Sequence, residues 1–346
     1  MHPLSIRPRR LAAGAAALAV VAGGLSACGA ASGSGGGTTE DGATVVRYQS
    51  YAGAVDPLQL ADALGELEGI ELERLGDVTG GPQSLQAVAS NQTDISANAF
   101  YGAIAQLVAS GAPLKAVVPS YGSNEVSNQK LAVLEESDIT DAEDFIGKKI
   151  AVNTLGANAE AVLDTWFDQE GLTEEEQDQI TLVPLPPLNT PEALAKGQVD
   201  GAILGFLGYE LLAQQYDVRT VVDDTEVVGG PYAGGGLAMR EEFIDANPDV
   251  TRELVEGVTA AIEFIETSSK QEVFDVYFPY LEEQGLADYI PAIETNFPGT
   301  LGLDPHPVIG EEDVSRWVDW LTSRGDIDAE DLDVSDVYTN DFNPNA

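Results

Sequence analysis

The 346-residue sequence contains one cysteine, two histidines and only 16 basic residues. The cysteine, Cys28, lies close to the N-terminus, so the rest of the chain has no disulfide and must be held by its hydrophobic core. Beyond His2 the one histidine is His306, which lies between two prolines as loop residues do. The parts of a Cys–His pair or a Ser–His–Asp set are therefore missing. The 58 acidic residues leave two-carboxylate chemistry open, although no pair among them is distinctive.

Acidic residues outnumber basic ones by 58 to 16, and the formal net charge is −42. A field of this sign repels phosphate groups, which argues against nucleic acid as a partner and against direct adhesion to anionic lipid. The acids are spread over predicted helix faces and turns, as in residues 173–178. We interpret them as a solvated surface rather than as a site for a cationic ligand.

The first 43 residues have the pattern of an exported, lipid-anchored protein. The basic start MHPLSIRPRR precedes an apolar run, LAAGAAALAVVAGG, that is too short and small-sided for a membrane span. The following LSACG resembles the lipobox of bacterial lipoproteins, in which Cys28 would carry the lipid. We expect a signal peptide at residues 1–27 and a flexible tether at residues 28–43. The alternative is an ordinary export signal with a chance cysteine at its end.

From Thr44 onward, segments with strand composition alternate with segments of helical spacing. TVVRYQS predicts a strand, and DPLQLADALGELEG predicts a helix with Pro57 in its first turn. The alternation restarts at KKIAV, residues 148–152, and predicts βαβ units with parallel sheets. The glycine-rich residues 229–236 interrupt both periods. Beyond them residues 247–267 have one apolar helical face, with Asn247 expected as the cap.

Two α/β segments followed by a helical return are most simply built as two lobes. We expect lobe I at residues 44–130 and 237–346, and lobe II at residues 131–236. The chain would cross between them as strands near residues 129–136 and 229–239. Binding sites favour such junctions and the carboxyl ends of parallel strands, so a ligand cleft between the lobes is expected.

The loop NTLGANAEA, residues 153–161, leads from a predicted strand into a predicted helix and can offer backbone N–H groups to a ligand. It has neither the lysine nor the following hydroxyl residue of a nucleotide-binding P-loop. We expect it to hold a carried solute rather than a nucleotide. Asn158 either contacts that solute or caps the helix.

Long segments on both sides of this loop carry a family resemblance: SLQAVASNQTDISANAFYGAIAQLVASGAPLKAVV, ITDAEDFIGKKIAVNTLGANAEAVLDTWFDQEGL and TPEALAKGQVDGAILGFLGYELLAQ. They resemble the solute-binding proteins of bacterial ABC importers, in the group that carries nitrate, sulfonates such as taurine, and pyrimidine precursors of thiamine. The resemblance runs from about Thr44 to the helix after Asn247. It implies a two-lobed α/β fold of the periplasmic-binding-protein type (type II), with two crossing strands and a helical C-terminal return.

The resemblance also implies a function without catalysis, cofactor or metal. It implies a monomeric receptor, anchored through Cys28 to the outer face of the cell membrane, that captures a small organic solute by hinge closure of the lobes. The partners would be an ABC permease and its ATPase. Two alternatives are a ligand-sensing module for a membrane signalling partner and an enzyme on the same scaffold.

The family's ligand contacts fall in loops at strand ends, and the matching positions here are Tyr51, Asn98, Phe100, Tyr101, Tyr121, Ser123, Thr154, Gly156, Ala157, Asn158, Gly205, Phe206 and Tyr232. The aromatic residues among them alternatively pack inside their own lobe. No Arg or Lys occurs in these loops, and we interpret the nearest ones, Lys130 and Arg240, as surface residues. Recognition of nitrate by charge is therefore disfavoured. A sulfonate held by amides and hydroxyls and a neutral heterocycle stacked on tyrosines both stay open.

Overall fold

The structure is a computed structural model that describes residues 37–39, 42–205, 208–328, 330 and 332–346. The expected signal peptide, the Cys28 anchor, most of the tether and Phe206 lie outside these residues. All described residues belong to one unit, Ser34–Ala346. None of the described helices has the length and apolar composition needed to cross a membrane.

The first part of the chain builds two small sheets, one of which includes the later strand β10. One is a parallel pair, β1 and β2, and the other has three strands in the order β3-β10-β4. The strands are β1 (Thr44–Ser50), β2 (Ile70–Asp77), β3 (Ile95–Phe100), β4 (Leu114–Ser123) and β10 (Tyr232–Arg240). The helices between them are α1 (Pro57–Leu64), α2 (Gly81–Ala89) and α3 (Tyr101–Ala109), which agrees with the predicted alternation.

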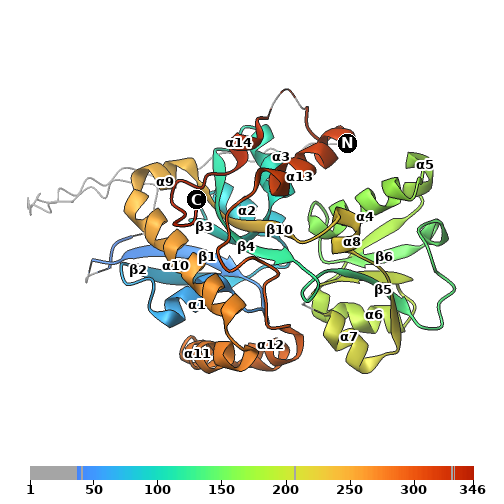
Figure 1. Cartoon of the computed structure of the whole chain (residues 1–346), viewed down its shortest axis with the longest axis horizontal. Coiled ribbons are helices and arrows are strands. Elements are labelled where there is room, and N and C mark those ends of the chain that lie inside the picture. Colours follow the sequence, from blue (N-terminus) through green and yellow to red (C-terminus); the bar gives the residue numbers. More distant parts are fainter. Residues whose placement is uncertain (1–36, 40–41, 206–207, 329, 331) are drawn as a thin grey trace, which may run out of the picture. The chain divides into compact units, whose positions relative to one another are not determined.

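The middle of the chain builds a five-stranded sheet in the order β7-β6-β8-β5-β9. Its strands are β5 (Lys130–Leu134), β6 (Lys149–Val152), β7 (Thr181–Pro184), β8 (Gly201–Leu204) and β9 (Val218–Asp223). The accompanying helices are α4 (Asn158–Gln169), α5 (Glu174–Gln177), α6 (Thr190–Ala195), α7 (Tyr209–Gln215) and α8 (Asp224–Val228). Figure 1 shows α6 and α7 on one side of this sheet and α4 and α8 on the other.

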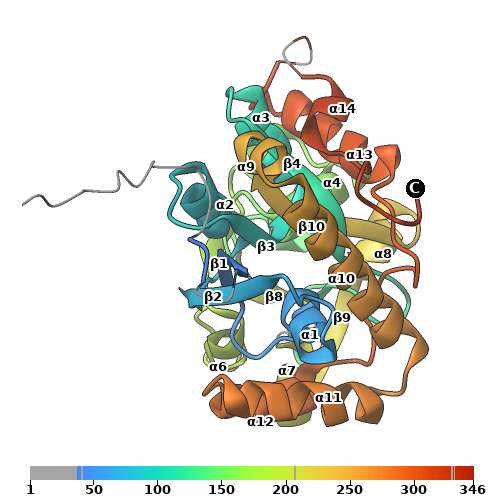
Figure 2. The same ribbon diagram turned by 90° about the vertical axis from the view of Figure 1, so that its left-hand side faces the viewer.

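After β10 the chain is helical, as predicted. The helices are α9 (Glu241–Ala246), α10 (Pro248–Thr267), α11 (Lys270–Glu283), α12 (Ile290–Asn296), α13 (Glu311–Ser323) and α14 (Val334–Val337), and short 3-10 turns occur at Glu143–Phe145, Pro187–Asn189 and Ala287–Tyr289. Helix α10 packs against α1 (Figure 2). Its predicted apolar face is confirmed, because Leu254, Val258, Ile262 and Ile265 are fully buried. Asn247 is the N-cap position, but its side chain donates to the Phe243 carbonyl instead of capping.

The prediction of parallel sheets is correct only in part. Strand β6 is parallel to β7 and β8, and β1 is parallel to β2. Strand β10 is antiparallel to β3 and β4, and β5 is antiparallel to β8 and β9. Strand β5 enters the five-stranded sheet from the three-stranded one, and β10 enters the three-stranded sheet from the five-stranded one. A parallel neighbour needs a crossover within one sheet, and because these strands arrive from the other sheet they pair antiparallel.

The chain passes between the three-stranded and five-stranded sheets in short segments, not along whole strands. Strand β5 pairs only within the five-stranded sheet, and β10 pairs with β4 from its first residue, Tyr232, which lies opposite Ser123. The connecting segments are therefore residues 124–129 and 229–231, in place of the predicted crossing strands. Ladder hydrogen bonds satisfy the backbone groups of both strands right up to the junction, which keeps each strand in one sheet.

Strand β10 fits between β3 and β4 because it is rich in glycine. A Cβ atom at Gly235 would lie 2.0 Å from the Ala99 carbonyl oxygen, and one at Gly236 would lie 2.1 Å from the Val118 carbonyl oxygen. Any larger residue would force the strands apart. The glycine run that interrupts the sequence periods is thus the buried central strand of a sheet.

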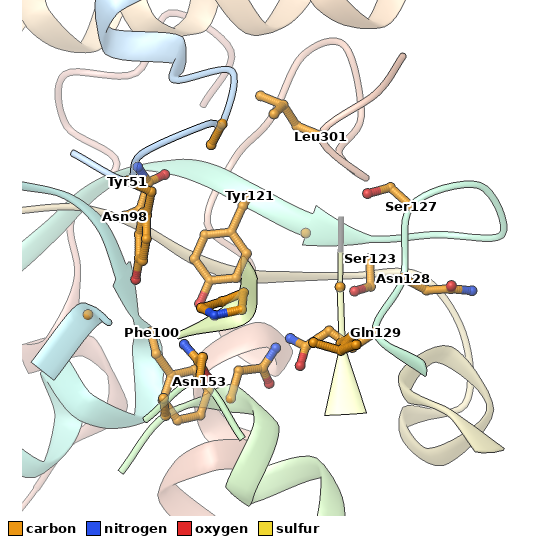
Figure 3. Close-up of a pocket in the computed structure, with 18 of the residues that line it drawn as sticks. Tyr51, Asn98, Phe100, Tyr121, Ser123, Ser127, Asn128, Gln129, Asn153 and Leu301 are labelled. Carbon is orange, nitrogen blue, oxygen red and sulfur yellow. The ribbon is translucent and has the colours of Figure 1, made fainter. Parts of the chain in front are cut away.

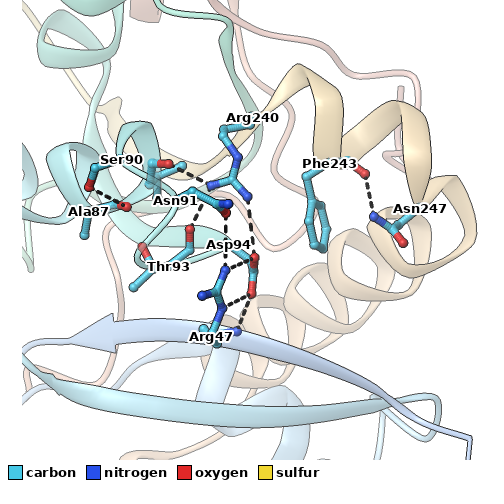
Figure 4. Close-up of polar contacts among 10 residues, drawn as sticks. Arg47, Ala87, Ser90, Asn91, Thr93, Asp94, Arg240, Phe243 and Asn247 are labelled. Atoms are coloured by element: carbon cyan, nitrogen blue, oxygen red, sulfur yellow. Dashed lines mark hydrogen bonds and ion pairs between the residues drawn. The ribbon is translucent and has the colours of Figure 1, made fainter. Parts of the chain in front are cut away.

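A buried ion cluster ties β1 to β10 (Figure 4). The fully buried Asp94 accepts hydrogen bonds from the Arg47 backbone N–H at 2.9 Å, from its Nε at 2.9 Å and from its Nη2 at 2.8 Å. Arg240 Nη2 lies 3.5 Å from the same carboxylate, and its Nη1 donates to the carbonyls of Val88 and Thr93. The interpretation of Arg240 as a surface residue is wrong, because this carboxylate and these carbonyls compensate its buried charge.

We predict that Asp94→Ala lowers the free energy of unfolding by about 3–5 kcal/mol, because it leaves two guanidinium groups without their shared carboxylate. Urea unfolding followed by circular dichroism measures this change. The matched control is Glu192→Ala, which removes an exposed carboxylate paired with Lys196 and should leave the free energy of unfolding nearly unchanged. Equal, small effects of the two substitutions would show that the Asp94 cluster is not a stabilising element.

Candidate functional site

A pocket with a cavity volume of about 130 Å³ has walls from both the three-stranded and the five-stranded sheet. One wall consists of the ends of β3 and β4, which contribute Asn98 and Tyr121. The opposite wall consists of the β6–α4 loop and the end of β8, which contribute Asn153, Asn158 and Gly205. The connecting segment 127–129 closes one side. Strand ends and junctions thus meet at one site, as expected for an α/β fold.

Most of the predicted ligand contacts line this pocket. They are Tyr51, Asn98, Phe100, Tyr121, Ser123, Ala157, Asn158 and Gly205. In Figure 3 the Tyr121 ring lies between Tyr51 and Asn98 on one side and Ser123 and Gln129 on the other. Four others are outside the lining, and Phe206 falls among the residues not described.

Those four predicted contacts have other neighbours. Tyr101 is fully buried in the core, as in the alternative interpretation of the aromatic residues. Thr154 packs on the N-cap of α2, where a Cβ atom at Gly80 would lie 2.3 Å from its Cγ2. Gly156 donates its N–H to Glu160, and Tyr232 is buried beside Asn158.

The lining also contains polar residues that were not predicted from the sequence: Ser120, Ser127, Asn128, Gln129, Asn153 and Thr190. Three of them lie at residues 127–129 of the connecting segment, where only Gln129 was predicted to belong to a strand. Their composition is a usable signal, because Asn is depleted in strands and favoured in irregular segments. Asn153 belongs to the loop that was singled out, one residue before the first predicted contact.

No charged side chain occurs in the lining that the described residues form. Its rings come from Tyr51, Phe100 and Tyr121, and its other side chains are mainly amides and hydroxyls. Such a pocket can stack a flat group and orient it by hydrogen bonds. It has no guanidinium or ammonium group with which to neutralise an anion.

The β6–α4 loop contributes a helix N-terminus to the wall. The N-cap residue of α4 is Ala157, which has no side chain able to cap. The Glu160 N–H donates to the Ala157 carbonyl, which leaves the N–H groups of Asn158 and Ala159 for a bound group. Asn158 is the first helical residue, and its side chain donates to the Tyr232 hydroxyl over 2.9 Å. The capping role considered for Asn158 is therefore wrong, since Tyr232 offers its amide a buried partner.

Behind Ser123 lies a carboxyl group that the sequence did not single out. Asp224 is fully buried and accepts hydrogen bonds from Ser123 Oγ at 2.6 Å and from the Tyr232 hydroxyl at 3.0 Å. Burial raises the pKa of Asp224 to about 6, although both hydrogen bonds favour the charged form. In the sequence it is one of many acids near a helix start, so only its tertiary partners distinguish it.

Burial also raises the pKa of two further carboxyl groups. Asp56 caps α1 by accepting from the Leu58 N–H at 2.9 Å, and burial raises its pKa to about 6. Asp164 of α4 accepts from Trp320 Nε1 at 3.1 Å, and burial raises its pKa to about 6 despite the opposing charge of Arg324. In both cases desolvation outweighs the partners that favour ionisation.

Comparisons with known proteins bear on the fold and the family. The family model described as NMT1/THI5 like matches residues 65–270. A protein from Bordetella bronchiseptica RB50 is 22% identical, with a TM-score of 0.71 over 86% of this chain and 95% of that one. The alkanesulfonate-binding protein SsuA from Xanthomonas axonopodis pv. citri, bound to MOPS, is 19% identical, with a TM-score of 0.65 over 86% and 98%.

The periplasmic nitrate-binding protein NrtA from Synechocystis PCC 6803 is 12% identical, with a TM-score of 0.64 over 87% of each chain. A search among curated proteins finds no match. The structural likeness confirms the predicted α/β fold of the two-lobed periplasmic-binding-protein type.

We predict that the melting temperature rises as the pH falls from about 8 to about 5. Asp56, Asp164 and Asp224 each have a folded-state pKa of about 6, above the ordinary value of 3.8, so the folded chain binds their protons more tightly than the unfolded chain does. The resulting stability is fully present below about pH 4 and is lost as the pH rises through about 6, by up to roughly 3 kcal/mol for each group.

Relief of surface repulsion acts in the same direction, so the control is Asp224→Asn. This variant has one titrating group fewer and should show a shallower rise in differential scanning calorimetry over the same pH range. A melting temperature that falls toward about pH 5, or an unchanged slope in the variant, would contradict the assignment of a raised pKa to Asp224.

Proposed function

Because this chain belongs to the NMT1/THI5-like family, we propose that it is the extracytoplasmic solute-binding protein of an ABC importer. The names of two structural neighbours, an alkanesulfonate-binding protein and a periplasmic nitrate-binding protein, support this role. In the proposal the chain is a monomer that captures a small organic solute without altering it. It then delivers the solute to a permease that works with an ATPase.

The observation that carries the proposal is a pocket with walls from two sheets. Asn98 and Tyr121 approach it from one sheet, and Asn153 and Asn158 approach it from the other. A solute that contacts both walls binds more tightly when they are close together, and this difference in affinity drives hinge closure. The connecting segments 124–129 and 229–231 are the proposed hinges. The proposed lobes are those of the sequence analysis, with the return boundary nearer Tyr232 because β10 pairs with β4 from that residue.

The lining favours an organic solute with a flat ring over nitrate. Tyr51 and Tyr121 can stack a ring, and amides can orient it. A small inorganic anion would bring a full charge to a wall without Arg or Lys among the described lining residues. A sulfonate is the second candidate, because the uncapped first turn of α4 can receive an anionic group.

We further propose that Cys28 anchors the mature chain to the outer face of the cell membrane. This part rests on the LSACG sequence and on the flexible residues expected after it. A sensor that passes closure to a signalling partner would use the same pocket, and an enzyme would need reacting groups in it.

A thermal-shift screen tests the proposed function. The panel contains sulfonates, neutral heterocycles, amides and small oxyanions including nitrate. An organic solute at about 100 times its dissociation constant should stabilise the fold by about 2.7 kcal/mol, which is readily measured. Stabilisation by nitrate alone would overturn the choice of an organic solute, and no stabilisation by any compound would count against solute binding itself.

Substitution of the stacking ring gives a second prediction. Tyr121→Ala should weaken binding of a ring-bearing solute at least about tenfold by calorimetric titration, because it removes the largest apolar contact at the centre of the pocket. The matched control is Tyr289→Ala, at a tyrosine outside the pocket lining, and it should bind as the unchanged protein does. Equal affinity of the two variants would exclude this pocket as the binding site.

A further inference from the structure

The side-chain amide of Asn158 is held by a chain of hydrogen bonds that ends at Asp224. Asn158 lines the pocket but is only 5% exposed, and its Nδ2 donates to the Tyr232 hydroxyl over 2.9 Å. The same nitrogen lies against the β10 backbone, where a Cβ atom at Gly234 would be 3.4 Å from it. The nitrogen end of the amide therefore points toward β10 and Tyr232.

The proton of the Tyr232 hydroxyl decides which end of this amide is favoured. Two acceptors lie near that oxygen: Asp224 Oδ2 at 3.0 Å and Asn158 Oδ1 at 3.4 Å. The carboxylate is both nearer and charged, so the hydroxyl donates to Asp224. Its lone pairs then face Asn158 and require a donor there. A flipped amide would place oxygen against oxygen, so the Nδ2 orientation is the stable one.

The consequence is that Asn158 offers its carbonyl oxygen, and not its NH₂ group, to the pocket. A second amide acceptor, Asn128 Oδ1, is buried without a partner among the described residues. At the opposite wall Ser120 donates to Asn98 Oδ1 over 2.9 Å, which leaves the Asn98 NH₂ group as a donor. The Asn158 side chain at the α4 wall and Asn128 of the connecting segment thus present acceptors, while Asn98 at the β3 wall presents a donor.

We propose that Asp224 and Tyr232 are positioning residues that fix the hydrogen-bond polarity of the pocket, so that it selects a ring-bearing solute with an N–H or O–H donor directed at Asn158. This inference rests on the proposed function and deepens it. Amides, amidines and amines meet the requirement. A sulfonate offers only acceptor oxygens and is selected against by the Asn158 carbonyl oxygen.

Calorimetric titration with benzamide, benzamidine and benzenesulfonate tests the inference, because these probes share a phenyl ring and differ in their polar group. The unchanged protein should bind benzamide or benzamidine at least about tenfold more tightly than benzenesulfonate, since the latter leaves a buried acceptor unpaired. Tyr232→Phe removes the hydroxyl and frees the Asn158 amide to turn. The preference should then fall to about threefold or less.

The matched control is Tyr289→Phe, which removes another tyrosine hydroxyl that donates to a carboxylate, that of Asp77, and should keep the full preference. The ratio of affinities is the decisive quantity, because a general loss of packing would weaken all probes alike.

Three results would overturn the inference. They are benzenesulfonate binding as tightly as benzamide, no binding of any probe, and an unchanged preference in Tyr232→Phe. The first and third leave solute binding intact, so the proposed function would survive them. After the second, the wider thermal-shift panel decides the proposed function separately.

Discussion

Backbone contact along β10 is the constraint on which the pocket depends. Because Gly235 and Gly236 carry no side chain, the returning strand fits between β3 and β4 and becomes the centre of a sheet. The same glycines leave room for the Tyr121 ring, which a Cβ atom at Gly235 would approach to 2.6 Å. At its start the strand delivers Tyr232 opposite Ser123, where the chain arrives from the other sheet. The close packing of β10 therefore positions three things: the Tyr121 ring of the pocket wall, the junction with the other sheet, and the Tyr232 hydroxyl that accepts from Asn158.

The charge of the whole chain contrasts with the uncharged pocket lining that the described residues form. The chain has a net charge of −42, yet the described lining contains no charged side chain. A buried carboxylate behind the lining, Asp224, acts through Ser123 and Tyr232. In such a site, selectivity comes from the direction of fixed dipoles and from unpaired buried acceptors rather than from net charge. The acidic residues thus lie outside the described lining, and their role in solvation stays a prediction.

The sequence predicts the parts of this fold whose signals are local. Apolar periodicity predicts the order of strands and helices. Three residues expected at strand ends, Tyr51, Asn98 and Tyr121, do line the pocket, although the last two lie within β3 and β4. It fails where a residue's role is set by a distant partner. Arg240 is buried because of Asp94, 146 residues away, and Asn158 is no cap because Tyr232, 74 residues away, engages its amide. Segment 127–129 was missed because strand pairing, which fixes where β5 begins, is also a tertiary property.

In the proposed function, this pocket binds one intact organic solute and releases it unchanged. Native mass spectrometry of the protein with a solute found by screening, followed by denaturation and analysis of the released compound, tests that claim most directly. We predict a one-to-one complex and recovery of the solute at its original mass, however long the incubation. A product of different mass that accumulates with time would contradict it and would favour an enzyme on the same scaffold.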